Sequence, residues 1–142
     1  MKDFIKEKLE NELLNENTRQ NAGILIQCTT TNRFFLLKRA NPPHNGKWAL
    51  LSGQMDKGED SLGAIKREIG EEISINPDII DIQFVQKDVS PNSGTIFFFY
   101  KGYVTEEFEP KLNEENVGYI WASVKNIPQP IFPGLPQKMG QA

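Results

Sequence analysis

Apolar positions follow a helical spacing in the middle of the chain. Between residues 60 and 75 apolar side chains recur three or four positions apart, at Leu62, Ile65, Ile69 and Ile73, and this spacing predicts an amphipathic helix. Asp60 is a better N-cap for this helix than the preceding Glu59. We expect the apolar stripe to anchor the helix while the opposite side faces solvent or a ligand.

Short runs rich in β-branched and aromatic residues, bounded by turn residues, predict the strands of a sheet. These runs cover residues 22–29, 33–39, 82–89, 95–104 and 118–122, and residues 48–51 form a further short apolar segment. The first two runs should form a hairpin around residues 30–32. Four consecutive aromatic residues, 97–100, place large side chains on both faces of one run, which predicts a central strand buried on both sides.

The two ends of the chain have patterns of their own. Apolar residues four apart within residues 1–17 predict a short amphipathic helix that packs on the domain or, alternatively, forms a homodimer contact; they are Ile5, Leu9 and Leu13. Residues 123–127 could form one helical turn with Ser123 as N-cap. Four prolines between residues 128 and 136 predict an irregular tail over residues 128–142.

Composition narrows the class of protein. A chain of 142 residues is expected to form a single domain, 1–142, that buries about two thirds of its unfolded surface. With 16 basic and 19 acidic residues, the net charge of −3 provides no broad surface for nucleic acid or anionic membranes. The lone Cys28 excludes an intrachain disulfide, and no apolar run could span a membrane. We therefore expect a cytoplasmic protein with small-molecule ligands.

Acidic residues within the predicted helix are the first candidates for chemistry. Glu68, Glu71 and Glu72 should project from one helical face within one turn, where their charges repel each other unless cations lie between them. Upstream, Gly53 and Gly58 bracket a loop whose backbone could approach a metal or a phosphate closely. Carboxylate oxygens suit Mg²⁺, which Mn²⁺ could replace. The alternative is an ordinary solvated helix face.

Residues 53–75 resemble the Nudix box, in which glycine, glutamate and an Arg-Glu pair recur at fixed spacing. The positions that match in register are Gly53, Glu59, Arg67, Glu68, Ile69, Glu71, Glu72 and Ile75, and Ser74 stands where the family has glycine. The resemblance implies an α/β fold, a Nudix-like α/β/α sandwich with a mixed β-sheet. A serine in the left-handed conformation is strained by about 1–2 kcal/mol, so either the helix ends differently or the strain is tolerated.

The resemblance also implies an activity and residue roles. It implies a Mg²⁺-dependent pyrophosphohydrolase in which water attacks one phosphorus of a nucleoside diphosphate linked to another group. The implied metal ligands are the backbone carbonyl of Gly53 and the carboxylates of Glu68, Glu71 and Glu72. As general base we favour Glu68, then Glu72, and Glu115 is the candidate outside the box, unless it is an ordinary loop acid. Arg67 would orient a catalytic glutamate; the simpler alternative is a surface ion pair.

Recognition of the substrate is less clearly encoded. Lys38, Arg39 and Lys47 are candidates for binding phosphates, although each could be an ordinary surface charge. His44 is better interpreted as a loop residue than as a metal ligand. A base could stack on an aromatic side chain, and the candidates for this are Phe34, Tyr119 and Trp121.

One proline points to a substrate. Pro91 lies 16 residues beyond Ile75, a spacing that in the family is associated with ADP-ribose hydrolysis, although a proline in a hairpin turn needs no functional reason. ADP-ribose or a related ADP-X compound is therefore the leading substrate. The alternatives are modified nucleoside triphosphates, dinucleoside polyphosphates, and a non-catalytic nucleotide sensor with the same fold.

Overall fold

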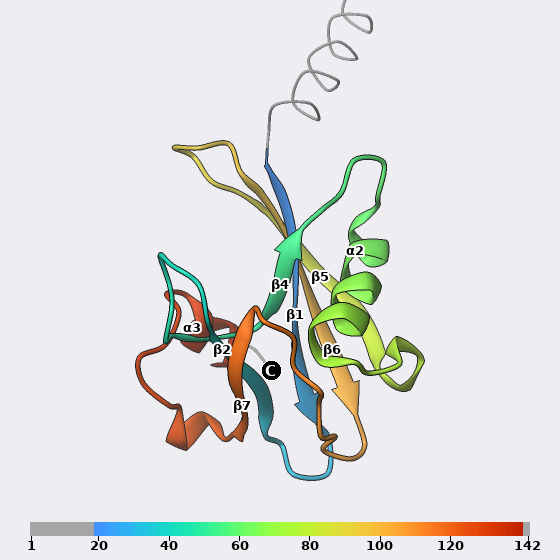
Figure 1. Cartoon of the computed structure of the whole chain (residues 1–142), viewed down its shortest axis with the longest axis vertical. Coiled ribbons are helices and arrows are strands. Elements are labelled where there is room, and N and C mark those ends of the chain that lie inside the picture. The colour runs from blue at the N-terminus through green and yellow to red at the C-terminus, as the bar shows by residue number, and fades with distance from the viewer. Residues whose placement is uncertain (1–18, 141–142) are drawn as a thin grey trace, which may run out of the picture.

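The computed structural model describes residues 19–140, which form a mixed sheet and a few short helices (Figure 1). The predicted helix within residues 1–17 lies outside the described residues. The strands are β1 (Gln20–Cys28), β2 (Phe34–Arg39), β3 (Trp48–Ala49), β4 (Leu51–Gln54), β5 (Asp81–Val89), β6 (Ile96–Val104) and β7 (Asn116–Ala122). The helical segments are α2 (Ser61–Glu68), the π-helical η1 (Ile69–Ile73), the 3₁₀ turns η2 (Pro77–Ile79) and η3 (Val124–Asn126), and α3 (Leu135–Gly140).

Strand β1 lies at the centre of the sheet. Among the described strands the order is β3-β2-β1-β6-β5, with β4 also paired to β1 and β7 to β2. The β1–β2 pair is the predicted antiparallel hairpin, whereas β1 and β6 run parallel over nine residue pairs from Gln20 with Ile96 to Cys28 with Val104. The sheet is therefore mixed, and β6 lies between β1 and β5, as its aromatic run predicts.

The sheet separates two apolar clusters because side chains alternate between its faces along each strand. Ile24 and Ile26 of β1 pack in one cluster with Ile65 and Ile69 of the helical segment α2–η1. On the other face, Leu25 packs in a cluster with side chains of α3, namely Leu135 and Met139. One helix therefore covers each face, which confirms the predicted α/β/α sandwich (Figure 1).

Three predictions about local structure need correction or completion. The helix expected over residues 60–75 divides into α2 and the π-helical η1, and Leu62, expected in its apolar stripe, is 39% exposed. Ser74 does adopt the left-handed conformation, with φ 56° and ψ 38°, so the strain is tolerated.

The tail is not irregular throughout, because residues 135–140 form α3. Pro136 lies in the first turn of α3, where a missing backbone N–H breaks no intrahelical hydrogen bond. Leu135 and Met139, four positions apart, are 2% and 1% exposed against the sheet. This burial outweighs the local preference of the prolines for irregular structure. None of the helices within residues 19–140 is long and apolar enough to span a membrane.

Candidate active site

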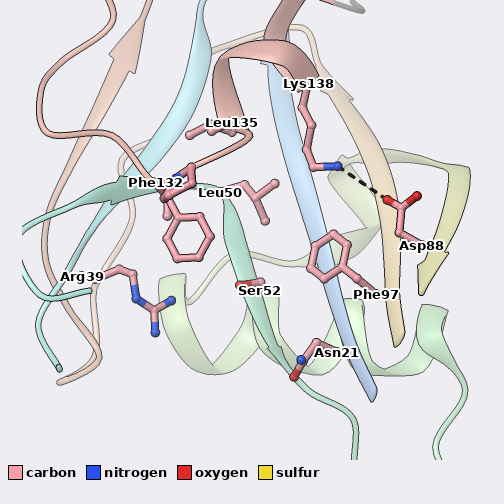
Figure 2. A pocket seen from close by; sticks show the side chains of 11 residues that line it. Asn21, Arg39, Leu50, Ser52, Asp88, Phe97, Phe132, Leu135 and Lys138 are labelled. Carbon is pink, nitrogen blue, oxygen red and sulfur yellow. Dashed lines mark ion pairs between the residues drawn. The ribbon is translucent and has the colours of Figure 1, made fainter. Parts of the chain in front are cut away.

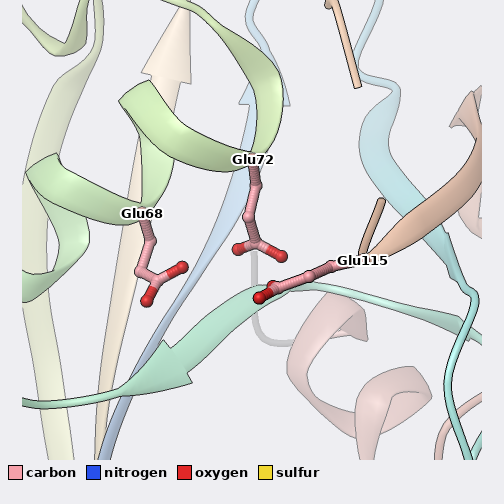
Figure 3. Close-up of side chains that lie close together, drawn as sticks. All are labelled: Glu68, Glu72 and Glu115. Carbon is pink, nitrogen blue, oxygen red and sulfur yellow. The ribbon is translucent and has the colours of Figure 1, made fainter. Parts of the chain in front are cut away.

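Three carboxylates, two from the helical segment α2–η1 and one from a distant loop, meet beside the sheet. Glu68 ends α2, Glu72 belongs to η1, and Glu115 directly precedes β7; one oxygen of each lies within 4.8 Å of the others (Figure 3). The backbone fixes Glu115, because its carbonyl accepts a hydrogen bond of 3.0 Å from the Ala40 amide, and its own amide donates to Asn113 Oδ1. The sequence thus named all three residues.

The burial of two of these carboxylates was not expected. Glu68 is 7% exposed and Glu72 is 4% exposed, whereas the sequence predicted only that this face meets solvent or a ligand. The amide Nδ2 of Asn116 donates to Glu72 Oε1 at 3.1 Å, but the buried Glu72 Oε2 has no hydrogen-bond partner within the described residues. Burial raises the pKa of Glu72 well above its usual range, and the neighbouring carboxylates of Glu115 and Glu68 act in the same direction.

These features fit a divalent cation. An unpaired buried carboxylate oxygen is costly, and a cation shared by the three carboxylates would remove both this cost and their repulsion. The ligands are all oxygen atoms, which suit hard cations of the Mg²⁺ or Mn²⁺ type. Glu68, Glu72 and Glu115 are the residues that could hold such an ion.

Glu71 is the predicted ligand that does not join this cluster. It is exposed, and its Oε2 accepts a hydrogen bond of 3.1 Å from Arg67 Nη1. The reason is the π-helical turn of η1, whose hydrogen bonds span five residues instead of four, so that each residue advances by a smaller angle around the axis. Glu71 is thereby rotated further from Glu68, while Glu72 stays on its side of the helix.

Arg67 holds the loop and the carboxylate cluster together. Its Nε and Nη2 donate to the two oxygens of Glu59 at 2.8 and 3.0 Å, and Nη2 also donates to the carbonyl of Gln54 at 3.1 Å. Its Nη1 donates to Glu68 Oε1 at 2.9 Å. The hydrogen bonds with Arg67 lower the pKa of Glu59. The geometry unites both interpretations of Arg67, because its ion pairs also orient Glu68.

Gly53 leaves the space that Glu68 occupies. It lies on β4, paired with Ala22 of β1. A Cβ atom at this position would lie 2.2 Å from Glu68 Oε1 and 2.4 Å from Glu68 Cδ. Only glycine therefore lets β4 approach this carboxylate so closely.

A pocket of about 380 Å³ lies on the α3 side of the sheet (Figure 2). Its lining residues are Asn21, Arg39, Ala49, Leu50, Ser52, Asp88, Phe97, Phe132, Pro133, Leu135 and Lys138. Ser52 lines the pocket while the next residue, Gly53, packs against Glu68, so the pocket and the carboxylates lie on opposite faces of β4. Arg39 is paired with Asn116 of β7, next to Glu115. The buried Nε of Arg39 has no hydrogen-bond partner in the described part of the chain.

Of the three basic candidates from the sequence, only Arg39 lines this pocket. Lys38 Nζ lies 5.9 Å from the centroid of the Trp48 ring, and Lys47 Nζ lies 3.2 Å from His44 Nδ1. His44 itself lies in the loop after β2, with its ring packed on Phe132 at a centroid distance of 4.6 Å.

The aromatic residues of the pocket were not those suggested by the sequence. Phe34 is 2% exposed in the core, and the rings of Trp121 and Tyr119 pack on Phe35. Phe97 and Phe132 line the pocket instead. Alternation along β6 could have indicated Phe97, but Phe132 and Lys138 lie in a segment whose prolines suggested irregular structure.

Comparison with known proteins identifies the family and agrees with the fold. Residues 17–139 match the NUDIX domain family. Similar solved structures include a MutT NUDIX hydrolase from Burkholderia pseudomallei, with 22% identity, TM-score 0.67, and coverage of 88% of this chain and 98% of that chain. An Ap4A hydrolase from C. elegans in a binary complex has 23% identity, TM-score 0.63, and coverage of 74% and 80%. The NUDIX domain of Shewanella oneidensis NrtR in complex with ADP ribose has 15% identity, TM-score 0.70, and coverage of 87% and 85%. No curated protein sequence matches the chain.

The chain belongs to the NUDIX domain family, because the match spans most of its length. It is an enzyme of the Nudix pyrophosphohydrolase class, and its acidic cluster could bind the divalent metal that such enzymes use.

Proposed function

We propose that this protein hydrolyses the pyrophosphate bond of a nucleoside diphosphate derivative in a Mg²⁺-dependent reaction, with Glu68, Glu72 and Glu115 as the metal-binding carboxylates. The observation that carries the proposal is the convergence of these three carboxylates, one with a buried oxygen that no described group satisfies. A divalent ion bound there would neutralise phosphate charge and lower the pKa of an attacking water.

The residues around the ion would have different roles in the reaction. Arg67 holds Glu68 at 2.9 Å and so fixes its orientation, which suits a ligand more than a freely moving base. Glu115 would offer one oxygen to the ion. Because this residue is exposed and makes no ion pair with the described residues, its second oxygen is the best placed in the cluster to accept a proton from water. Among the basic residues, Arg39 is the strongest candidate for holding a substrate phosphate, because it lines the pocket and its buried Nε has no hydrogen-bond partner within the described residues.

The leading substrate remains ADP-ribose or a related ADP-X compound, on the spacing of Pro91, which is exposed in the turn between β5 and β6. Nucleoside triphosphates and dinucleoside polyphosphates are the second candidate. Lys138, which lines the pocket, is the residue that bears on this choice. Proteins of similar fold include an Ap4A hydrolase and a domain in complex with ADP ribose. Both classes of substrate are therefore tested.

The test is product analysis with a panel of nucleotides. The protein is incubated with ADP-ribose, dinucleoside polyphosphates, FAD and nucleoside triphosphates, with Mg²⁺, with Mn²⁺ and with a chelator. Metal-dependent release of AMP from ADP-ribose is the expected result. An inert ADP-ribose with a rapidly cleaved triphosphate would reject the leading substrate, and binding of nucleotides without any cleavage would favour the sensor.

A further inference from the structure

A lysine ammonium lies at one end of the pocket and is only partly neutralised. The nearest carboxylate to Lys138 Nζ is Asp88 Oδ2, at 3.9 Å, which is too long for a hydrogen bond. The side chain of Lys138 is 22% exposed, whereas that of Asp88 is 51% exposed, so the lysine is the more buried partner. Among the described residues, no side-chain hydrogen bond satisfies its three N–H donors.

Aromatic rings hold this ammonium in place. Lys138 Nζ lies 4.3 Å from the centroid of the Phe99 ring and 5.6 Å from that of Phe97. Because ring faces attract cations but accept no conventional hydrogen bond, this arrangement positions the charge and leaves its donors free. Leu135 and Met139 bury α3 against the sheet, which fixes the helix that carries Lys138.

The two ends of the pocket differ in their relation to the carboxylate cluster. In Figure 2, Phe132 and Phe97 lie on either side of Leu50, with Arg39 at one end of the pocket and the Lys138–Asp88 pair at the other. The pocket and the carboxylates lie on opposite faces of β4, but Arg39 is paired with Asn116, the residue next to Glu115, whereas Asp88 lies on β5 at the other edge of the sheet. The Arg39 end of the pocket is therefore the end nearer to the cluster along the sheet. The end at Lys138 is left for the part of the ligand that does not react.

The ammonium at the Lys138 end of the pocket favours a ligand group that accepts hydrogen bonds. At this end of the pocket Phe97 offers an aromatic surface to a planar ring, and a donor-only ammonium pairs well with a carbonyl oxygen of a base, as lysine does with O6 of guanine. An exocyclic amino group, such as N6 of adenine, would instead direct its own N–H donors at the ammonium. Asp88 could accept from such a group, but it lies on the more exposed side of the pair.

We propose that Lys138 is a specificity-determining residue, which makes the pocket prefer a nucleotide whose base carries a carbonyl group over the corresponding adenine nucleotide. The proposal rests on the proposed function only in taking the ligand to be a nucleotide. It disagrees with the indication from Pro91, which favours an adenine nucleotide, so the experiment decides between two explicit alternatives.

Binding of IMP and AMP tests this preference without any hydrolysis. The two nucleotides have the same size and phosphate. They differ at position 6 of the base, where IMP has a carbonyl and AMP an amino group, and at the adjacent N1, which carries a proton only in IMP. Monophosphates contain no pyrophosphate bond, so titration calorimetry measures affinity independently of activity. The expected result for the wild type is a Kd for IMP at least about tenfold lower than that for AMP. Equal affinities, a preference for AMP, or binding of neither would overturn the proposal.

Variants assign the preference to the ammonium. Lys138→Met keeps an unbranched side chain over Phe99 and removes the charge, so IMP and AMP should then bind within about twofold of each other. Lys87→Met is the matched control, because Lys87 Nζ also lies over an aromatic ring, 5.8 Å from the centroid of Phe98, but Lys87 is not among the residues lining the pocket. This control should keep the preference of the wild type. A retained preference in Lys138→Met would refute the role of the lysine.

If circular dichroism shows that Lys138→Met does not fold, a second variant still tests the proposal. Asp88→Asn removes the partner charge and leaves the ammonium, so the preference for IMP should persist or increase. If the preference disappears in Asp88→Asn, the carboxylate reads the base and the proposal is wrong. Selective binding of IMP by a protein that hydrolyses no nucleotide would retain this inference while rejecting the proposed function.

Discussion

The close packing of Gly53 against Glu68 leads to a quantitative prediction for Gly53→Ala. The added Cβ would lie 2.2 Å from Glu68 Oε1, whereas ordinary van der Waals contact begins at 3.4 Å, so the carboxylate must retreat by about 1 Å (3.4 − 2.2 = 1.2). The φ angle of Gly53 is not in the left-handed region, so alanine adds no backbone strain. The substitution also keeps the backbone carbonyl, so it tests the position of the Glu68 carboxylate alone.

The expected losses follow from this displacement. A shift of about 1 Å in a catalytic group can reduce the rate by about 100-fold, so we expect a decrease of that order in kcat/KM on whichever nucleotide proves to be the substrate. Metal binding provides a readout that needs no substrate. If affinity also falls about 100-fold, a Mg²⁺ concentration of 100 Kd that stabilises the wild type by about 2.7 kcal/mol would stabilise the variant by only about 0.4 kcal/mol.

Thermal unfolding with and without Mg²⁺ measures this difference. Gly70→Ala is the matched control, because a Cβ at Gly70 would have no neighbour within 4 Å, and alanine in a helical segment stabilises by up to about 1 kcal/mol. Any loss of thermal stability that the contact causes in Gly53→Ala should be partly recovered in the double variant with Glu68→Asp, since the shorter side chain relieves the contact. Wild-type activity and metal response in Gly53→Ala would refute the claim that this glycine positions Glu68.

Three further predictions follow from other parts of the structure. Glu72→Gln should lower turnover at least about 100-fold with the fold intact by circular dichroism, whereas the exposed Glu106→Gln should not; unchanged turnover would remove Glu72 from the metal site. Ser74→Gly should raise the free energy of unfolding by about 0.5–1 kcal/mol in urea, because Ser74 has φ 56°, whereas Gly58→Ala, at φ 82°, should lower it; a destabilised Ser74→Gly would show that the left-handed serine is not strained. Hydrogen bonds from Arg33 lower the pKa of Glu107, so this pair should stabilise the fold above the ordinary glutamate pKa and lose its effect as pH falls below it. Urea melts of wild type and Glu107→Gln should therefore differ at pH 7 and converge near pH 3, and a constant difference would contradict this assignment.

The elements and part of the candidate metal site are local properties of the sequence. Short continuous runs of β-branched and aromatic residues predict β1, β2 and β6, because a strand buried on both faces of a sheet carries apolar side chains on both. The spacing of Glu68 and Glu72 brings both side chains to one side of the helical segment, and Arg67 lies next to Glu68 in the sequence. These relations are set within a few residues, so the sequence alone was sufficient for them.

Long-range packing decided the rest. Glu115 joins the cluster because β7 pairs with β2, a contact between segments far apart in the sequence. Glu71 leaves it because η1 forms a π-helical turn, and residues 135–140 form a helix because Leu135 and Met139 find a buried surface on the sheet. The pocket combines side chains of β1, β2, β4, β5, β6 and α3, so no local pattern could have assembled it. Spacing along the chain determines which side chains share a face, but only tertiary pairing determines which faces meet.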